Sequence, residues 1–278
     1  IGGETVMFRH EKRFENPPGL AVIISDTMND VEISRRLESL KLYTFNRVGV
    51  TLKPELIALK YESGDPSSYA ALASRAVNET EAGIIMLCED TAAIKAGVLV
   101  CGNRKPLLSA ITVENFERMS NLAVEFGLTV VARGDSMDEL SELTTRLNTA
   151  GIKDIILDTG ARKLNQALAD QVSLRRLALL KKFRALGYPT IVFPAEMTDN
   201  PLKEALIASA LMAKYAGIIV LSDFRGETLF PLLVARLNLY TDPQRPLATS
   251  EGIYEINGPD ENSPVAITSV SIPDAALA

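Results

Sequence analysis

The stretch LTVVARGDSMDELSELTTRLNTAGIKDIILD, residues 128–158, holds one complete strand–helix–strand unit and sets the pattern of the whole chain. It opens and closes with apolar runs, at 128–133 and 154–158, and residues 136–150 between them carry a helical pattern. Gly151 follows the last helical turn, where glycine suits the left-handed conformation that commonly ends a helix. The apolar runs are continuous rather than alternating, which is typical of parallel strands buried on both faces.

The same unit recurs along the chain, so that eight apolar runs alternate with eight helical patterns. The predicted strands cover residues 19–25, 56–62, 83–89, 106–111, 128–133, 154–158, 189–193 and 217–222. The predicted helices cover residues 29–41, 66–80, 90–99, 114–126, 136–150, 162–186, 201–215 and 226–239. Asp65 followed by Pro66 predicts the start of the second helix. Four glycines are predicted to end helices in the left-handed conformation: Gly127, Gly151, Gly187 and Gly217.

Eight successive strand–helix units predict a (β/α)8 TIM barrel, an α/β fold. The alternative is an open, doubly wound sheet, whose first turn usually carries a glycine-rich motif that binds phosphate. No such motif follows the strand predicted at 19–25, and this favours the barrel.

Two segments fall outside the repeated units. Residues 1–18 are predicted to hold a hairpin over 4–14 that closes the bottom of the barrel, because apolar side chains alternate there with charged ones. The barrel is assigned to residues 19–249. Residues 250–278 are rich in Pro, Asp, Asn and Ser, so we expect an extended tail or the start of a linker. Because the first residue is Ile1 rather than Met, the natural chain is expected to begin further upstream.

Composition argues against several classes of function. The net charge is −6, and no segment gathers Lys and Arg densely enough to bind a phosphate backbone, so nucleic acid is not an expected partner. The apolar runs are far too short to cross a membrane. Two cysteines, Cys88 and Cys101, suit a reduced, cytoplasmic protein better than a disulfide-bonded one. With a single histidine as well, the chain lacks the ligand spacing of a zinc or iron–sulfur site, and no metal ligand is predicted.

Polar side chains follow several of the predicted strands, at the end of a barrel where ligands bind. Three carboxylates in these positions are candidate ligand-binding residues: Asp26, Asp158 and Asp223. Asp158 lies in LDTGAR, where Gly160 opens a turn before a helix whose N-terminus suits an anion. The alternative is that such residues simply cap helices, as Asp after a strand often does. No catalytic residue is assigned.

The only histidine, His10, lies in the charged strip FRHEKRF, residues 8–14. It precedes the first strand and therefore belongs to the bottom of the barrel, away from the strand ends that carry chemistry. We expect Arg9, His10 and Glu11 to form a structural clasp, since features at that end of a barrel usually serve stability.

The sequence of that strip and its neighbours also resembles a known protein family. GGETVMFRHEKRF followed by GLAVIISD is similar to the large subunit of the corrinoid iron–sulfur protein, also called the gamma subunit of acetyl-CoA decarbonylase/synthase. Further matching segments occur in order along nearly the whole chain: FNRVGV (45–50), NRKPLLSA (103–110), LDTGAR (157–162), RRLALLKKFRALGYP (175–189), RLNLYTDPQRP (236–246) and ENSPV (261–265).

The resemblance implies a methyl carrier of the reductive acetyl-CoA pathway. In that family a corrinoid cobalt takes a methyl group from a methyltetrahydropterin through a methyltransferase and passes it to acetyl-CoA synthase. The large subunit has an iron–sulfur domain, a central barrel and a corrinoid-binding domain, and it pairs with a small subunit that is also a barrel. The implied partners are therefore the small subunit, the methyltransferase and acetyl-CoA synthase.

This chain resembles only the central barrel of that subunit. The cysteine motif of the iron–sulfur domain would lie upstream of Ile1, and the corrinoid domain downstream of 261–265, where AITSVSIPDAALA departs from the family pattern. The resemblance therefore implies a corrinoid and a 4Fe–4S cluster for a full-length protein and no cofactor bound by this segment. The tail would be the start of the linker to the missing corrinoid domain.

Three functions remain open. The first is a non-catalytic barrel scaffold of the methyl carrier, whose surfaces hold the partners. The second is a stand-alone enzyme resembling the pterin-dependent methyltransferase barrels, suggested by the carboxylates at the strand ends. The third is a regulatory relative that binds corrinoid proteins without carrying cobalt.

Overall fold

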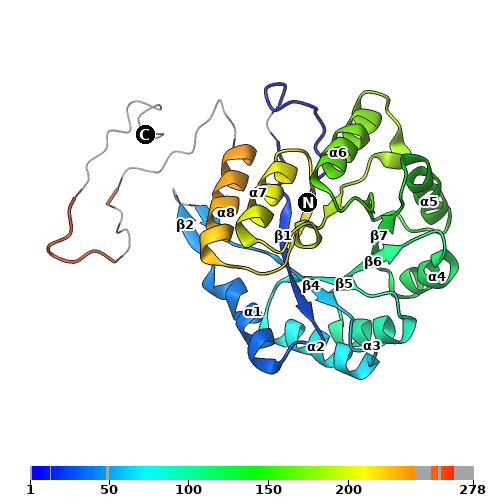
Figure 1. The fold of residues 1–278 in the computed structure, drawn as a ribbon, viewed down its shortest axis with the longest axis horizontal. Coiled ribbons are helices and arrows are strands. Elements are labelled where there is room, and N and C mark those ends of the chain that lie inside the picture. The colour runs from blue at the N-terminus through cyan, green and yellow to red at the C-terminus, as the bar shows by residue number, and fades with distance from the viewer. Residues whose placement is uncertain are drawn as a thin grey trace.

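The computed structural model describes residues 2–12, 14–47, 50–241, 252–253, 255 and 258–265. Within them, eight parallel strands form a barrel surrounded by helices (Figure 1). Its strands are β1 (Gly19–Ser25), β4 (Leu56–Lys60), β5 (Gly83–Leu87), β6 (Leu107–Ile111), β7 (Thr129–Arg133), β8 (Ile155–Asp158), β9 (Ile191–Val192) and β10 (Ile218–Leu221). The α-helices are α1 (Asp30–Leu42), α2 (Pro66–Glu79), α3 (Thr91–Cys101), α4 (Phe116–Phe126), α5 (Met137–Thr149), α6 (Leu164–Leu179), α7 (Pro201–Met212) and α8 (Gly226–Tyr240).

The strands are ordered β8-β7-β6-β5-β4-β1-β10-β9, and each pairs in parallel with the next. The two ends of this order meet in one described bridge, between Leu157 and Thr190. The amide of Leu157 donates there to the carbonyl of Pro189 at 2.8 Å. The ring is thus closed, which confirms the predicted TIM barrel and rules out the open sheet.

Two apolar layers hold the barrel together. Its interior is filled mainly by small and branched side chains: Ala21, Leu56, Ala58, Ile85, Leu107, Ala110, Val131, Ile191, Phe193, Ile218 and Val220. A larger cluster lies between the strands and the surrounding helices. Both faces of the strands are therefore covered, which explains the continuous apolar runs in the sequence.

The helix boundaries agree with the local signals in most units. The side chain of Asp65 accepts hydrogen bonds from the amides of Ser67 and Ser68, with Pro66 in the first turn, as predicted. Gly127 and Gly151 take positive φ angles of 61° and 92° after α4 and α5.

The prediction for the other two glycines is wrong. Gly187 has φ −83° and follows a short 3-10 helix, η1 (Arg184–Leu186). The long helix predicted over 162–186 ends at Leu179, and Lys182 just beyond it has a positive φ of 53°. After α7 the left-handed residue is Tyr215, with φ 74°, and not Gly217. A Cβ on Gly217 would lie 2.9 Å from the carbonyl oxygen of Thr190, so this glycine serves close strand packing.

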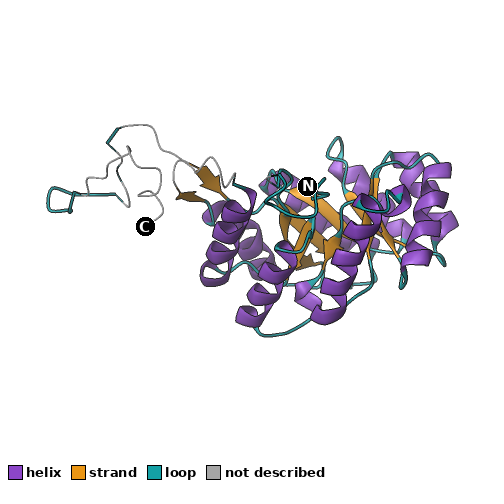
Figure 2. Ribbon diagram, turned by 90° about the horizontal axis from the view of Figure 1, so that it is seen from above, coloured by secondary structure: helices purple, strands orange, loops and turns teal. Residues whose placement is uncertain are grey.

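A small antiparallel hairpin between α1 and β4 was not predicted. It pairs β2 (Phe45–Arg47) with β3 (Val50–Leu52) and stands apart from the barrel strands (Figure 2). The rings of Phe45 and Phe230 lie 4.9 Å apart, which fixes the hairpin on the outer side of α8. Its strands are three residues long, too short to show a clear alternation in the sequence.

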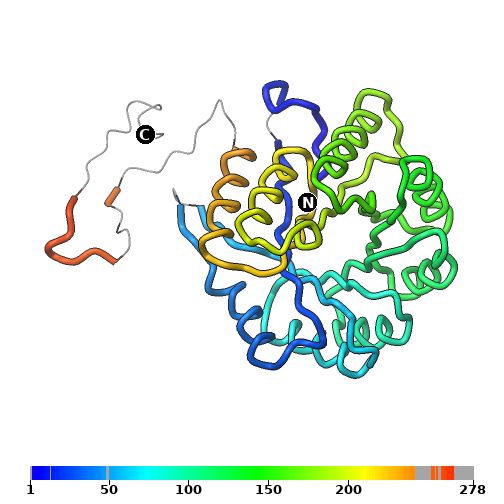
Figure 3. The backbone as a smooth tube through the Cα atoms, viewed as in Figure 1, coloured from blue at the N-terminus to red at the C-terminus, as the bar shows by residue number. Residues whose placement is uncertain are grey.

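The described residues of the segment 2–18, which we call the N-terminal strap, carry turns and bends, and none of them lies in a strand of the hairpin predicted over 4–14. The buried carboxylate of Glu4 accepts hydrogen bonds from the amides of Glu15 and Asn16 at 3.0 and 2.6 Å, and these bonds close the segment into a loop. Met7 and Phe14 pack with Tyr215, whose hydroxyl donates to the carbonyl of Met7 at 2.6 Å. These contacts place the strap near the N-terminal end of β10, beside α6 (Figure 3).

The last described helix of the barrel, α8, ends at Tyr240. The predicted barrel boundary at residue 249 falls within residues 242–251, which lie outside the described residues, so the boundary stays a prediction. Most of the tail predicted over 250–278 also lies outside them. None of the described helices is long and apolar enough to span a bilayer.

Replacing Glu4 with alanine should destabilise the protein by about 1–3 kcal/mol, because two backbone amides lose a charged acceptor. Urea unfolding measures the change, and limited proteolysis should show earlier cleavage within the strap. Glu11→Ala is the control, since Glu11 is exposed and its carboxylate accepts one long hydrogen bond, from the amide of Phe8 at 3.4 Å. Equal stabilities for the two variants would contradict this role of Glu4.

Candidate functional site

Asp158, at the end of β8, is almost fully buried, with 3% of its surface exposed. One carboxylate oxygen accepts from the amide of Gly160 at 2.9 Å and from Arg162 at 3.1 Å. The other oxygen accepts from the second terminal nitrogen of Arg162 at 2.9 Å. Such bidentate pairing is among the strongest geometries available to a carboxylate and a guanidinium. Three hydrogen bonds from the chain itself therefore hold this candidate.

Arg162 connects this carboxylate to the neighbouring strand. Its guanidinium also pairs with Glu196 in η2 (Pro194–Glu196) and lies 4.5 Å from the centre of the Phe193 ring. Burial opposes the charge of Arg162, but the hydrogen bonds and charges of Asp158 and Glu196 outweigh it and raise the pKa of the guanidinium. The group ties the end of β8 to the segment that follows β9, across the junction where the barrel closes.

Asp26, after β1, is bound to the loop that follows β4. One of its oxygens accepts from the amides of Glu62 and Ser63 at 2.8 and 2.9 Å, and the other from the Ser63 hydroxyl at 2.6 Å. Beside it, Ser25 donates to Glu62 at 2.6 Å. Hydrogen bonds from Lys60 and then Ser25 lower the pKa of Glu62. The two loops are thus held together by polar contacts within the chain.

Asp223, after β10, binds helix α1. One carboxylate oxygen lies 2.9 Å from the guanidinium of Arg35, and the other accepts from the amide of Phe224 at 2.8 Å. Arg35 also pairs with Glu32. Hydrogen bonds from Arg35 and then Arg36 hold the pKa of Glu32 at about 2, below its ordinary value of 4.5.

Two largely buried charged side chains in this region were not identified from the sequence. Arg36 donates to the backbone carbonyls of Ile23 and Ser222, and so joins the ends of β1 and β10. Glu204 of α7 accepts from the amide and hydroxyl of Ser222, both at 2.6 Å. Burial raises the pKa of Glu204 despite these bonds. An ionisable residue on the inner face of an apolar helix is the signal that would have pointed to Glu204.

The three residues of the predicted clasp lie in the strap, and they make separate contacts. Arg9 donates to the backbone carbonyl of Thr241 at 2.5 Å, which connects the strap to the end of α8. His10 stacks on Phe8 with the ring centres 5.5 Å apart. Glu11 accepts from the amide of Phe8. The contact of Arg9 reaches a distant part of the chain, whereas these contacts of His10 and Glu11 are local. A clasp formed by all three together therefore stays a prediction.

The described residues contain no group of three or more His, Cys, Asp or Glu side chains placed to hold a metal ion. Cys88 and Cys101 are both buried thiols. Burial raises the pKa of Cys88 to about 12 and also raises that of Cys101. Because iron–sulfur clusters are bound by thiolates, usually four, these side chains do not fit such a cluster.

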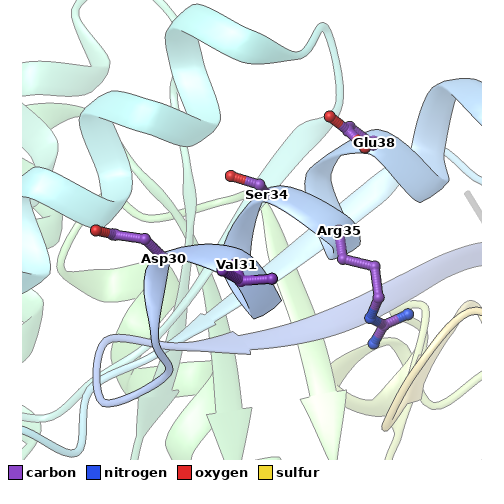
Figure 4. A pocket seen from close by; sticks show the side chains of 5 residues that line it. All are labelled: Asp30, Val31, Ser34, Arg35 and Glu38. Carbon is purple, nitrogen blue, oxygen red and sulfur yellow. The ribbon is translucent and has the colours of Figure 1, made fainter.

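A surface depression with a volume of about 400 Å³ lies on the outside of α1. Its lining residues all come from that helix: Asp30, Val31, Ser34, Arg35 and Glu38 (Figure 4). Arg35 extends away from the other labelled side chains in that view and is the residue bound to Asp223. Three of its five lining residues are charged, and none of the three candidate carboxylates lines it.

Replacing Asp158 with asparagine should destabilise the protein by about 2–4 kcal/mol, because it leaves a buried guanidinium with part of its charge unpaired. Urea unfolding measures the loss. Asp30→Asn is the matched control, since the Asp30 side chain is 97% exposed and its pair with Arg75 at 3.2 Å should contribute little. A loss below about 0.5 kcal/mol in Asp158→Asn, the range of an exposed pair, would contradict a structural role for Asp158.

The pair between Glu32 and the two arginines should stabilise the fold in a pH-dependent way. Because the folded pKa of Glu32 is below the unfolded one, its contribution is complete above pH 4.5 and is lost as the pH falls toward about 2. The stability difference between the wild type and Glu32→Gln should therefore shrink as urea unfolding is repeated from pH 7 down to pH 3. Glu38→Gln, on the exposed side of the same helix, is the control. A difference that is independent of pH would show that this pair does not stabilise the fold.

Comparison with known proteins finds a matching family model and curated relatives. The family model described as CO dehydrogenase/acetyl-CoA synthase delta subunit matches residues 1–272. The corrinoid/iron-sulfur protein large subunit of Moorella thermoacetica is 37% identical over 97% of this chain and 60% of its own length. The acetyl-CoA decarbonylase/synthase complex subunit gamma of Methanopyrus kandleri is 34% identical, over 97% of this chain and 60% of its own. The chain thus spans about three fifths of the length of these curated relatives.

Solved structures support the fold alone. The dihydropteroate synthase of Vibrio fischeri ES114 matches with a TM-score of 0.59 at 16% identity, over 82% of this chain and 95% of that one. The dihydropteroate synthase of Thermus thermophilus matches with a TM-score of 0.56 at 16% identity, over 81% of this chain and 95% of that one. Identities this low carry no functional argument.

The relatives confirm the resemblance to the corrinoid iron–sulfur protein large subunit that was seen in the sequence. On the match over residues 1–272, the chain belongs to the CO dehydrogenase/acetyl-CoA synthase delta subunit family.

Proposed function

We propose that this chain is the barrel scaffold of a corrinoid methyl carrier. The carrier takes a methyl group from methyltetrahydropterin through a methyltransferase and delivers it to acetyl-CoA synthase. The names of the relatives support the pathway. One observation supports the scaffold role: each of the three candidate carboxylates at the strand ends is already bound by donors of the fold.

A ligand at the strand ends would have to displace these contacts. Asp26 would release the loop after β4, and Asp158 would release Arg162 from the junction between β8 and β9. Asp223 would release Arg35 of α1. The cost is largest at Asp158, which is buried, because a buried group that loses its partner is strongly destabilising; this position is therefore better suited to holding the barrel than to exchanging ligands.

The proposal also concerns the cofactors of a full-length carrier, which would have the length of the curated relatives. A corrinoid and a 4Fe–4S cluster would be carried outside this segment, and no step of the methyl transfer is assigned to its residues. The partners that we propose are the small subunit of the corrinoid protein, the methyltransferase and acetyl-CoA synthase, in the cytoplasm. Neither nucleic acid nor a membrane is included.

The alternative enzyme, a stand-alone barrel similar to pterin-dependent methyltransferases, is not favoured by the contacts described at the strand ends. It was suggested by the carboxylates at the strand ends, and three of these, Asp26, Asp158 and Asp223, bind donors within the chain. A regulatory relative would share the surfaces of the scaffold and differ only in lacking the cofactor domains.

The scaffold proposal predicts that this chain forms a one-to-one complex with the small subunit of the corrinoid protein from the same organism. Sedimentation velocity at micromolar concentration would detect the complex. Asp26→Asn should form it with unchanged affinity, because Asp26 serves a loop contact and not the partner. No complex with the wild-type chain would overturn the scaffold proposal.

A further inference from the structure

The N-terminal strap is bound to two helices that are far apart in the sequence. Arg175 of α6 donates to the carbonyl of Glu4 in the strap at 3.1 Å. Arg9 of the strap donates to the carbonyl of Thr241, the residue after α8, at 2.5 Å. In Figure 1 the strap, in dark blue, lies between α6 and α8, and side chains of both helices pack against it. The strap therefore connects the start of the chain to the end of α8.

An aromatic group fixes the middle of the strap. Tyr215, which follows α7, donates its hydroxyl to the carbonyl of Met7 at 2.6 Å. The centre of the Phe14 ring lies 6.2 Å from that of Tyr215 and 5.9 Å from that of Tyr240, in the last turn of α8. Because Glu4 also closes the strap into a loop, the loss of one of these contacts should loosen the others with it.

Two buried nitrogen atoms at these contacts have no hydrogen-bond partner. Among the buried side-chain nitrogen and oxygen atoms in the described part of the chain, only the Nε atoms of Arg9 and Arg175 are unpaired. Arg175 is 4% exposed, and burial lowers the pKa of its guanidinium. A buried donor without a partner destabilises the state that buries it. Opening the strap would let water reach both atoms, which favours the open state.

The backbone of Tyr215 is strained as well. Its φ of 74° lies in the left-handed region, which bulky side chains rarely adopt. Such a conformation persists only where surrounding contacts hold it, and it is common in segments that switch between two states. The closed strap thus has unpaired buried donors at two of its contacts and a strained residue at its centre. It is held less firmly than the paired strands of the barrel.

We propose that the strap is a latch poised to open, which leaves the barrel as one unit and releases the end of α8 at Thr241 as it does so. The opening breaks the bond from Arg9 to Thr241 together with the contact between Phe14 and Tyr240. In a full-length carrier, the segments on either side of the barrel would then be released together. This last consequence rests on the proposed function, whereas the latch itself does not.

Independent fraying of α8 is the alternative to a latch. Helix ends open locally without help, so the last turn of α8 would then exchange its amide hydrogens on its own. The two cases differ in their response to a change within the strap contacts. A latch makes the strap and the last turn of α8 respond equally, whereas fraying leaves the helix end unaffected.

Native-state hydrogen exchange, followed by mass spectrometry on the purified chain, tests the latch. Tyr215→Phe removes the hydroxyl that binds Met7 and keeps the ring against Phe14. The strap amides in this variant, those of Glu15 and Asn16 among them, should exchange about tenfold faster, which is the effect of losing one hydrogen bond. The last turn of α8 should exchange faster by the same factor, and the amides of β1 should not change.

Tyr69→Phe is the matched control, because Tyr69 is also buried and donates its hydroxyl to a backbone carbonyl, that of Leu59, at 3.1 Å. It should leave exchange in the strap and in the last turn of α8 unchanged. Three results for Tyr215→Phe would overturn the latch: faster exchange in the strap alone, equally faster exchange in β1, or no change anywhere. The measurement needs no partner, so a failed latch would leave the scaffold proposal standing. A missing complex with the small subunit would likewise leave the latch standing.

Discussion

The contact between Asp158 and Arg162 is the constraint on which the barrel's closure depends. One described bridge, between Leu157 of β8 and Thr190 just before β9, joins the two ends of the sheet, and β9 is only two residues long. Few backbone hydrogen bonds therefore join the two ends of the sheet. Arg162 adds a bidentate pair to Asp158, a second pair to Glu196 and a contact over Phe193. Asp158, a candidate for ligand binding, thus helps to hold the junction between β8 and β9, where the described residues share one backbone bridge.

Other arginines play a similar part around the barrel. Arg236 donates to the carbonyls of Pro18 and Lys53 and pairs with Glu55. Arg104 donates to three carbonyls at the end of α2 and the start of β5: Val77, Thr80 and Ala82. A guanidinium has five donors in a fixed plane, so one side chain can satisfy several loop carbonyls that no strand or helix would pair. The loops at both ends are fixed in this way, which suits a rigid support.

The repeated unit was enough to predict the barrel. Strands buried on both faces appear in the sequence as continuous apolar runs, and helices appear as apolar residues at helical spacing. β1 was predicted with its observed bounds. The strap and the hairpin β2–β3 were not, because their order comes from contacts with distant residues such as Tyr215 and Phe230. The role of Gly217 was predicted wrongly for the same reason, because its lack of a side chain is required by the close approach of Thr190, the residue before β9.

The positions of the candidate site residues were predictable, and their partners mostly were not. Asp158 and Arg162 are four residues apart and could have been paired from the sequence. Arg35 and Asp223 are separated by 188 residues, and only the fold brings them together.

The central claim is that the carboxylates at the strand ends serve the fold and not a ligand. Titration calorimetry of the purified chain with methyltetrahydrofolate tests it most directly. The account predicts no saturable heat up to millimolar ligand. Saturable binding that disappears in Asp26→Asn, in a variant that remains folded, would contradict it and make this barrel a pterin-binding protein.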